Sequence, residues 1–139
     1  LPDQGLHTFA YALYPHKGDW RLAHSEREAA GYNQALCCAL EDSHTGSIAP
    51  AKAMISCSAP NVMISSVKCA ENGDKALIVR LVEMHGQPAN AKIRWAWKVT
   101  KVEQVNPVEE HYIDITAQAD GCEVPLLKHE IVTLKLWLS

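Results

Sequence analysis

The chain has 139 residues, of which 47% are apolar and 21% are charged. This length suits one ordinary domain or two very small ones, and the composition argues against a disordered chain. The net charge is -3 with scattered Lys and Arg, so the sequence lacks the clustered positive charge of proteins that bind nucleic acids or anionic membranes. No run approaches the ~20 apolar residues of a membrane span.

The first third of the chain predicts two strands and one helix. Residues 6–14 (LHTFAYALY) are rich in aromatic and apolar side chains, which predicts a mostly buried strand. Ser25 and Glu28 have the spacing of a capping box, in which each side chain accepts from a free backbone N–H, so we expect a short helix over 25–36. The apolar run at 36–40 (LCCAL) predicts a second buried strand.

A polar stretch then separates two parts of the chain. Residues 41–52 contain Gly and Pro and predict a loop, and a short strand is expected over 53–58. The turn at 59–61 is a plausible boundary, so we expect one domain over residues 1–60 and another over residues 61–139.

From residue 62 onward, short apolar runs alternate with turn signals, as is typical of an antiparallel β-sandwich. The pair Asn72-Gly73 favours a tight hairpin, because both residues tolerate positive φ. The last strand carries four apolar residues on one face and no Pro or inward charge, which predicts a central strand and not an edge. We expect strands over 62–69, 76–83, 91–97, 99–105, 112–116, 122–127 and 131–138, with Val132, Leu134, Leu136 and Leu138 facing inward.

The cysteines indicate a reducing compartment. Their number is odd, two are adjacent, and no C-x-x-C spacing occurs, which argues against a disulfide framework and a zinc finger. Most lie in apolar runs, so we expect reduced, buried thiols and a cytoplasmic protein. The five residues are Cys37, Cys38, Cys57, Cys69 and Cys122.

Histidines and carboxylates show no catalytic pattern. No two histidines have the H-x-x-x-H spacing of a metal site on a helix, and most carboxylates fall in predicted turns or strand ends, where solvated groups are common. We therefore assign no catalytic and no metal-binding residue, and the substrate-binding residues stay unknown. The groups considered are His7, His16, His24, His44, His85, His111 and His129, with Asp3, Asp19, Asp42, Glu83, Glu109, Glu110, Asp114 and Glu130.

Tryptophans leave two interpretations open. Trp95 and Trp97 share a strand face, and Trp137 on the last strand is a further candidate for it. Such a face could stack on sugar rings, as could Trp20 if exposed. A packed core or an interface with another domain explains the same pattern more often. Exposure of Trp95 and Trp97 separates a carbohydrate-binding module from a structural one.

Specific motifs resemble glycoside hydrolase family 38 α-mannosidases. Residues 3–18 resemble that family's G-x-H-x-F-x-Y-A-L-x-P-H-x-G stretch, 32–36 its Asn-x-x-Leu after a short helix, and 67–71 with 76–86 its V-K-x-A-E and L-I-V-R-L-x-E-x-H-G strand pair. Residues 130–136 resemble its closing E-I-x-T-L-x-L. The first stretch matches at Gly5, His7, Phe9, Tyr11, Ala12, Leu13, Pro15, His16 and Gly18. The departures are Cys37-Cys38, the loop 41–52, Trp95 and Trp97.

The resemblance implies an all-β chain with one short helix. Residues 1–60 would end the family's β-supersandwich, and residues 61–139 would form its small C-terminal β-sandwich. Family members are retaining enzymes that hydrolyse terminal α-linked mannose with an Asp nucleophile and a divalent metal, usually zinc. Those groups belong to an N-terminal catalytic domain, and none maps onto this chain, so no cofactor is expected in it.

The expected role is therefore structural. The resemblance, which is closest to the cytosolic and bacterial branch, implies that the chain packs on the catalytic domain and partly walls its active site. The parent enzyme would act on mannose-containing oligosaccharides, while this chain alone would be inactive. A homo-oligomer is possible. The alternative is a carbohydrate-binding sandwich that uses an aromatic face.

Overall fold

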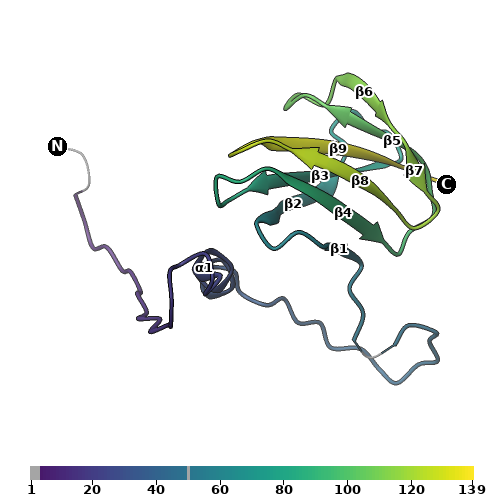
Figure 1. Ribbon diagram of the computed structural model, residues 1–139. Helices are drawn as coiled ribbons and strands as arrows, with labels where there is room; N and C mark the ends of the chain where they lie inside the picture. Colours follow the sequence, from purple (N-terminus) through teal and green to yellow (C-terminus); the bar gives the residue numbers. More distant parts are fainter. Residues whose placement is uncertain (1–3, 50) are drawn as a thin grey trace. The chain divides into compact units, whose positions relative to one another are not determined.

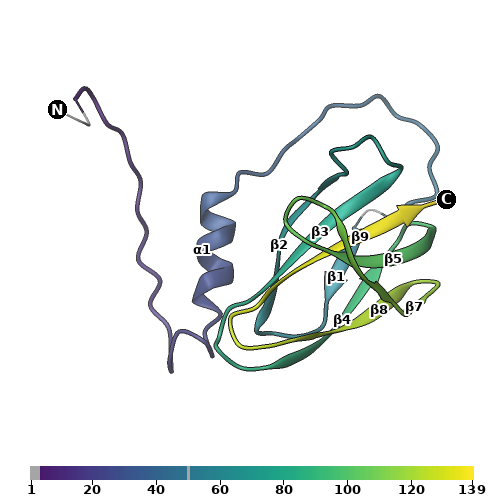
Figure 2. The ribbon, with the colours of Figure 1, turned by 90° about the horizontal axis from the view of Figure 1, so that it is seen from above.

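A computed structural model describes residues 4–49 and 51–139 (Figures 1 and 2). The chain divides into two compact units, one ending at Leu36 and one running from Cys37 to Ser139. Within the described residues, no helix is long and apolar enough to cross a membrane.

The first unit contains an extended segment and helix α1 (Ser25–Asn33). The predicted helix is present but shorter, and the predicted capping box is wrong. His24 occupies the N-cap position with φ 50°, and no side chain caps the helix. No residue of α1 is buried, so the helix has no packed face inside this unit that would extend it to residue 36.

The prediction of a buried strand over residues 6–14 is wrong for this structure. The segment is extended but forms no strand, and its apolar side chains lie in solvent: Leu6 is 97% exposed, Phe9 83% and Leu13 88%. A strand needs a neighbouring strand in a ladder, and among the described residues this segment belongs to no sheet.

The second unit begins with residues 37–54, which form no helix or strand among those described. The predicted loop at 41–52 is consistent with this, but the predicted strand at 36–40 is wrong. All five thiols are free, and the expectation that most are buried is also wrong. Cys37, Cys38 and Cys69 are exposed, Cys57 is half-buried, and only Cys122 is buried, where desolvation raises its pKa to about 11.

The second unit is an antiparallel β-sandwich, as predicted (Figure 1). The four-stranded sheet has the order β1 (Ile55–Cys57), β4 (Ala89–Trp95), β8 (Gly121–Leu126), β7 (Ala117–Gln118). The five-stranded sheet has the order β2 (Val62–Cys69), β3 (Ala76–Glu83), β9 (Ile131–Leu138), β5 (Val99–Val105), β6 (His111–Ile115).

The hairpin between β2 and β3 forms at the predicted turn. Gly73 has φ 79°, which a glycine adopts without strain. Asn72 uses its side chain, accepting from the backbone N–H of Asp74 at 3.1 Å and donating to the Asp74 carboxylate at 2.7 Å. The short strand β7 is the one element of the sandwich that the sequence did not indicate.

The core lies between the two sheets, and β9 stands at the centre of the larger one. Val132, Leu134 and Leu136 are at most 1% exposed and pack against β4 and β8 residues such as Ile93 and Val124. β9 pairs with β3 on one side and β5 on the other, which confirms the predicted central strand. The predicted division at residues 60/61 stays a prediction.

Candidate functional site

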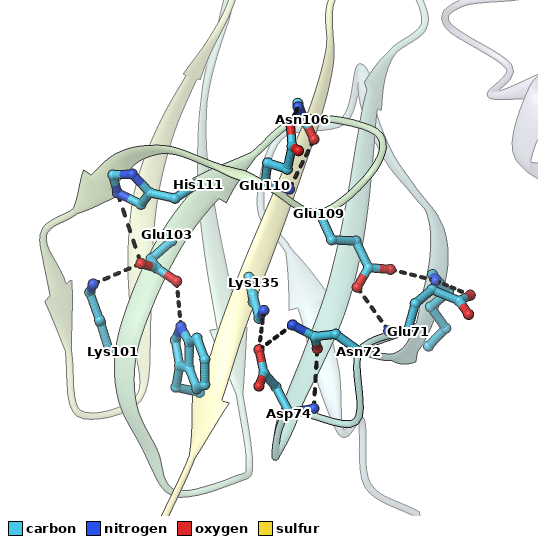
Figure 3. A network of polar contacts seen from close by, with 12 residues as sticks. Glu71, Asn72, Asp74, Lys101, Glu103, Asn106, Glu109, Glu110, His111 and Lys135 are labelled. Atoms are coloured by element: carbon cyan, nitrogen blue, oxygen red, sulfur yellow. Dashed lines mark hydrogen bonds and ion pairs between the residues drawn. The ribbon is translucent and has the colours of Figure 1, made fainter.

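The outer face of the five-stranded sheet carries a group of polar and charged side chains, and some of the charged ones are hidden from water. Alternation along β9 points Thr133, Lys135 and Trp137 away from the core, yet Thr133 and Lys135 are only 4% exposed. The loops 71–74 and 106–110 lie over this face (Figure 3). We call the group the polar cover: Lys68, Glu71, Asn72, Asp74, Lys101, Glu103, Asn106, Glu109, Glu110, His111, Lys135 and Trp137.

Lys135 anchors the hairpin loop to the centre of the sheet. Its ammonium lies 2.5 Å from the Asp74 carboxylate and 4.5 Å from the centre of the Trp137 ring. A buried ammonium needs an anion, and an indole face adds a further attraction. The hydrogen bonds from Lys135 and Asn72 lower the pKa of Asp74, which keeps it ionised for this contact.

Glu103 holds the other half of the cover together. Its carboxylate accepts from Lys101 Nζ at 2.7 Å and from Trp137 Nε1 at 2.5 Å. Burial favours the neutral acid, but these two hydrogen bonds outweigh it and lower the pKa of Glu103. The indole of Trp137 is therefore fixed in place by a polar contact at its edge and a cation at its face.

Glu109 ties the second loop to the opposite side of the sheet. It has φ 68°, a conformation that is strained for a residue with a side chain. Its carboxylate accepts from Lys68 Nζ at 2.6 Å and from the backbone N–H of Glu71 at 2.9 Å, and the Lys68 contact lowers its pKa. Asn106 closes the loop by accepting from the backbone N–H groups of Val108 and Glu110.

Two groups of the cover and the neighbouring Asp114 have the spacing of metal ligands. Glu103, His111 and Asp114 each offer one ligand atom, and these atoms lie within 4.8 Å of one another. The Lys101 ammonium, however, contacts Glu103 at 2.7 Å and Asp114 at 3.0 Å. Because a lysine already supplies the positive charge, this arrangement does not fit a resident metal ion.

Six carboxyl groups of the sandwich lack the property of a glycosidase general acid. Retaining hydrolysis needs a general acid whose pKa is raised, beside an ionised nucleophile. On the sandwich, the pKa is instead lowered for Asp74, Glu83, Glu103, Glu109, Asp114 and Glu123. These six are ionised at neutral pH, so none of them can act as that acid.

Glu83 is a buried carboxylate that organises the end of β3. It accepts from the backbone N–H groups of His85, Gly86 and His129 at 2.8 to 2.9 Å and from Asn61 Nδ2 at 2.9 Å. Burial opposes ionisation, but these hydrogen bonds prevail and lower the pKa of Glu83 to about 2. With all of its acceptor positions engaged, Glu83 is a structural group and not a free base.

The comparison with family models decides the assignment. Residues 61–134 match the model described as glycosyl hydrolases family 38 C-terminal beta sandwich domain. The chain belongs to this family. It is also 38% identical over 88 residues to Alpha-mannosidase 2C1 from Homo sapiens, a match that covers 60% of this chain. The chain spans about 8% of the length of that curated relative.

The tryptophans of this family 38 sandwich do not form an aromatic platform. Trp95 is 6% exposed and belongs to the core, and Trp97 packs partly buried against the same core. Trp137 lies on the opposite face of the larger sheet, in the polar cover, and Trp20 belongs to the other unit with Arg21 stacked on its ring at 4.4 Å. The aromatic-face interpretation is therefore wrong.

Several other groups considered from the sequence have partners close by in the chain or on the same sheet. Of the seven histidines, His111 joins carboxylates on the sandwich, 3.2 Å from Asp114 and 3.8 Å from Glu103. Asp19 accepts from the backbone N–H groups of Arg21 and Leu22, and Glu130 from that of Leu127. Asp42 lies in the stretch without regular structure, and Asp3 lies outside the described residues.

Sequence reasoning missed five charged residues of the cover, together with the role of Lys135: Lys68, Glu71, Asp74, Lys101 and Glu103. The available signal was polar residues at alternate positions of strands that are otherwise apolar. This pattern is ordinarily that of a solvated sheet face. Nothing in the sequence shows that two loops fold over the face and bury it.

Proposed function

We propose that this chain is the non-catalytic C-terminal β-portion of an α-mannosidase that removes terminal α-linked mannose from oligosaccharides. In this role it packs on an upstream catalytic domain and helps to wall the active site. The observation that carries the proposal is the match of residues 61–134 to the family's C-terminal sandwich, supported by the likeness to a relative named as an α-mannosidase.

The extended segment 5–14 supports docking on another part of the enzyme. Phe9, Tyr11 and Leu13 occupy alternate positions, as on one face of a strand, and each is at least 80% exposed. Such a row of apolar side chains is stable only when it is covered. We infer that the upstream polypeptide supplies the neighbouring strand and the covering surface.

The metal and the compartment are part of the same proposal. The divalent metal implied by the family, usually zinc, would be bound by the catalytic part, since the Glu103, His111 and Asp114 cluster is already neutralised by Lys101. Five free thiols, three of them exposed, favour a reducing compartment such as the cytoplasm. Homo-oligomerisation of the parent enzyme remains part of the proposal.

Complementation tests the proposed function. The parent enzyme is prepared without these 139 residues, and hydrolysis of an aryl α-mannoside is measured before and after the separate chain is added. We expect no turnover from the chain alone, weak or absent activity from the truncated enzyme, and restored activity from the mixture. Turnover by the chain alone, or full activity of the truncated enzyme, would contradict the proposal.

A matched pair of variants tests the docking segment. Tyr11→Ser with Leu13→Ser removes the apolar row, while Ala10→Ser with Ala12→Ser changes the other face of the same segment. We expect the first pair to abolish restoration and the second pair to preserve it. Equal restoration by both pairs would show that segment 5–14 is not the docking element.

A further inference from the structure

A groove opens on the sandwich where the chain crosses from one sheet to the other. Thr116 is the single residue between β6 in the five-stranded sheet and β7 in the four-stranded sheet (Figure 1). Both sheets line the groove here, with Asp114 and Ile115 from β6 and Ile93 and Arg94 from β4. Its volume is about 490 Å³, within the range of small-molecule sites.

The groove combines apolar residues with paired charges. Ile115 is half-buried and contributes apolar surface, while Ile93 and Cys122 are buried behind it. Arg94 pairs with Asp120, and Lys92 pairs with Glu123 at 3.2 Å. Each of these four side chains is more than half exposed, so the pairs add little to stability and can exchange partners with a ligand at small cost.

The charged residues that line the groove indicate which class of ligand it can bind. Two cations and three carboxylates line the groove, the third carboxylate being Asp114, so neither a phosphate nor a metal ion is favoured by the local field. Neighbouring donors and acceptors suit vicinal hydroxyl groups, which accept from a guanidinium and donate to a carboxylate. The accessible part of the Ile115 side chain suits the C–H face of a pyranose ring.

We propose that this groove binds a neutral hexose unit of a mannose-containing oligosaccharide. The proposal rests on the proposed function for its choice of sugar, and it replaces the aromatic face with a polar groove on the same sandwich. Arg94 and Asp120 are the central hydrogen-bonding groups, and Gln118 adds an amide beside them. No aromatic ring lines the groove, so the affinity is in the millimolar range and serves to orient a longer glycan.

Titration of the isotope-labelled 139-residue chain with methyl α-mannoside and with an α-mannobiose tests the proposal by amide chemical shifts. We expect saturable shifts at Arg94, Gln118, Asp120 and Gly121. Arg94→Gln and Asp120→Asn each weaken binding about tenfold, because each removes a hydrogen bond to a charged group. The matched controls Lys128→Gln and Asp42→Asn change the same charges at exposed positions outside the groove and leave binding unchanged.

Three results would overturn the proposal: no saturable shift with either sugar, shifts that both groove variants leave unaltered, or stronger shifts with inorganic phosphate than with the sugars. The variants replace exposed side chains, and retained spectral dispersion confirms that they fold. The titration involves no hydrolysis, so its failure is separate from failure of the complementation test. If the chain restores hydrolysis but binds no sugar, the sugar-binding groove is contradicted and the proposed function is not. If the chain binds sugar but restores no hydrolysis, the proposed function is contradicted and the groove is not.

Discussion

The ammonium of Lys135 lies 2.5 Å from the carboxylate of Asp74, although Lys135 sits at the middle of the central strand with only 4% of its surface exposed. Breaking such a contact from one side leaves a charge without its partner, whereas an apolar residue of similar shape removes the need for the partner. The two halves of this pair are therefore not equivalent in a mutational test.

We expect Asp74→Asn to lower the midpoint of urea unfolding more than Lys135→Met does. The first change leaves the buried ammonium without its anion, and the second removes the charge while keeping the packing on Trp137. Lys92→Met and Glu123→Gln, in an exposed pair, serve as controls with little effect. A Lys135→Met variant less stable than Asp74→Asn contradicts this reading of the polar cover.

We expect the decrease in the free energy of unfolding at acid pH to depend on Glu83. Its pKa is lowered from 4.5 to about 2. The stabilisation is thus complete above pH ~4.5 and is lost as the pH falls toward 2, and the shift corresponds to ~3 kcal/mol. We expect Glu83→Gln to lose about that much at neutral pH and to flatten the profile between those limits. Glu41→Gln, which removes a carboxylate at an exposed position, is the matched control in urea titrations at each pH.

Leu134→Ala tests the central position of β9. Leu134 is fully buried, so truncation removes apolar contacts and leaves a cavity, at a cost of ~2–5 kcal/mol. Leu127→Ala is the matched control, since Leu127 is 69% exposed and its loss should change stability by less than ~0.5 kcal/mol. Equal unfolding midpoints for the two variants would contradict the expectation that β9 at the centre of the sheet contributes much of the stability.

We expect Gly121→Ala to weaken the pairing of β8 with β4. A Cβ at this position would lie 2.4 Å from the Ile93 carbonyl oxygen, and backbone cannot rotate away as a side chain can. We expect a loss of roughly 1–3 kcal/mol and altered amide shifts along both strands. Gly46→Ala, where a Cβ meets nothing within 4 Å, should be neutral in the same thermal unfolding assay.

The sandwich could be predicted because its sequence is locally consistent. Strands β2, β3, β5 and β9 begin and end at the predicted residues, since each combines an apolar run with turn residues at both ends. The strand expected at 6–14 has the same local pattern but no neighbour among the described residues. Periodicity reports what a segment can pair with, and not whether its partner is present.

The polar cover could not be predicted from the same patterns. Lys135 and Glu103 occupy outward positions of their strands, where charged residues are ordinarily solvated. Their burial depends on the loops at 71–74 and 106–110, and on Glu109 with φ 68° bringing its carboxylate to Lys68. The paths of the loops and the partners of these side chains depend on the tertiary structure. The sequence therefore indicated the strands but not what covers their outer face.

The pairing of β9 also governs how fast the sandwich can assemble. Its neighbours β3 and β5 lie far earlier in the chain, so the middle of the larger sheet forms only after long loops have closed. Folds dominated by such non-local pairing have a high contact order and fold in milliseconds to seconds. Until β9 pairs with them, β3 and β5 each expose one unpaired edge, and such edges favour self-association of an incompletely folded chain.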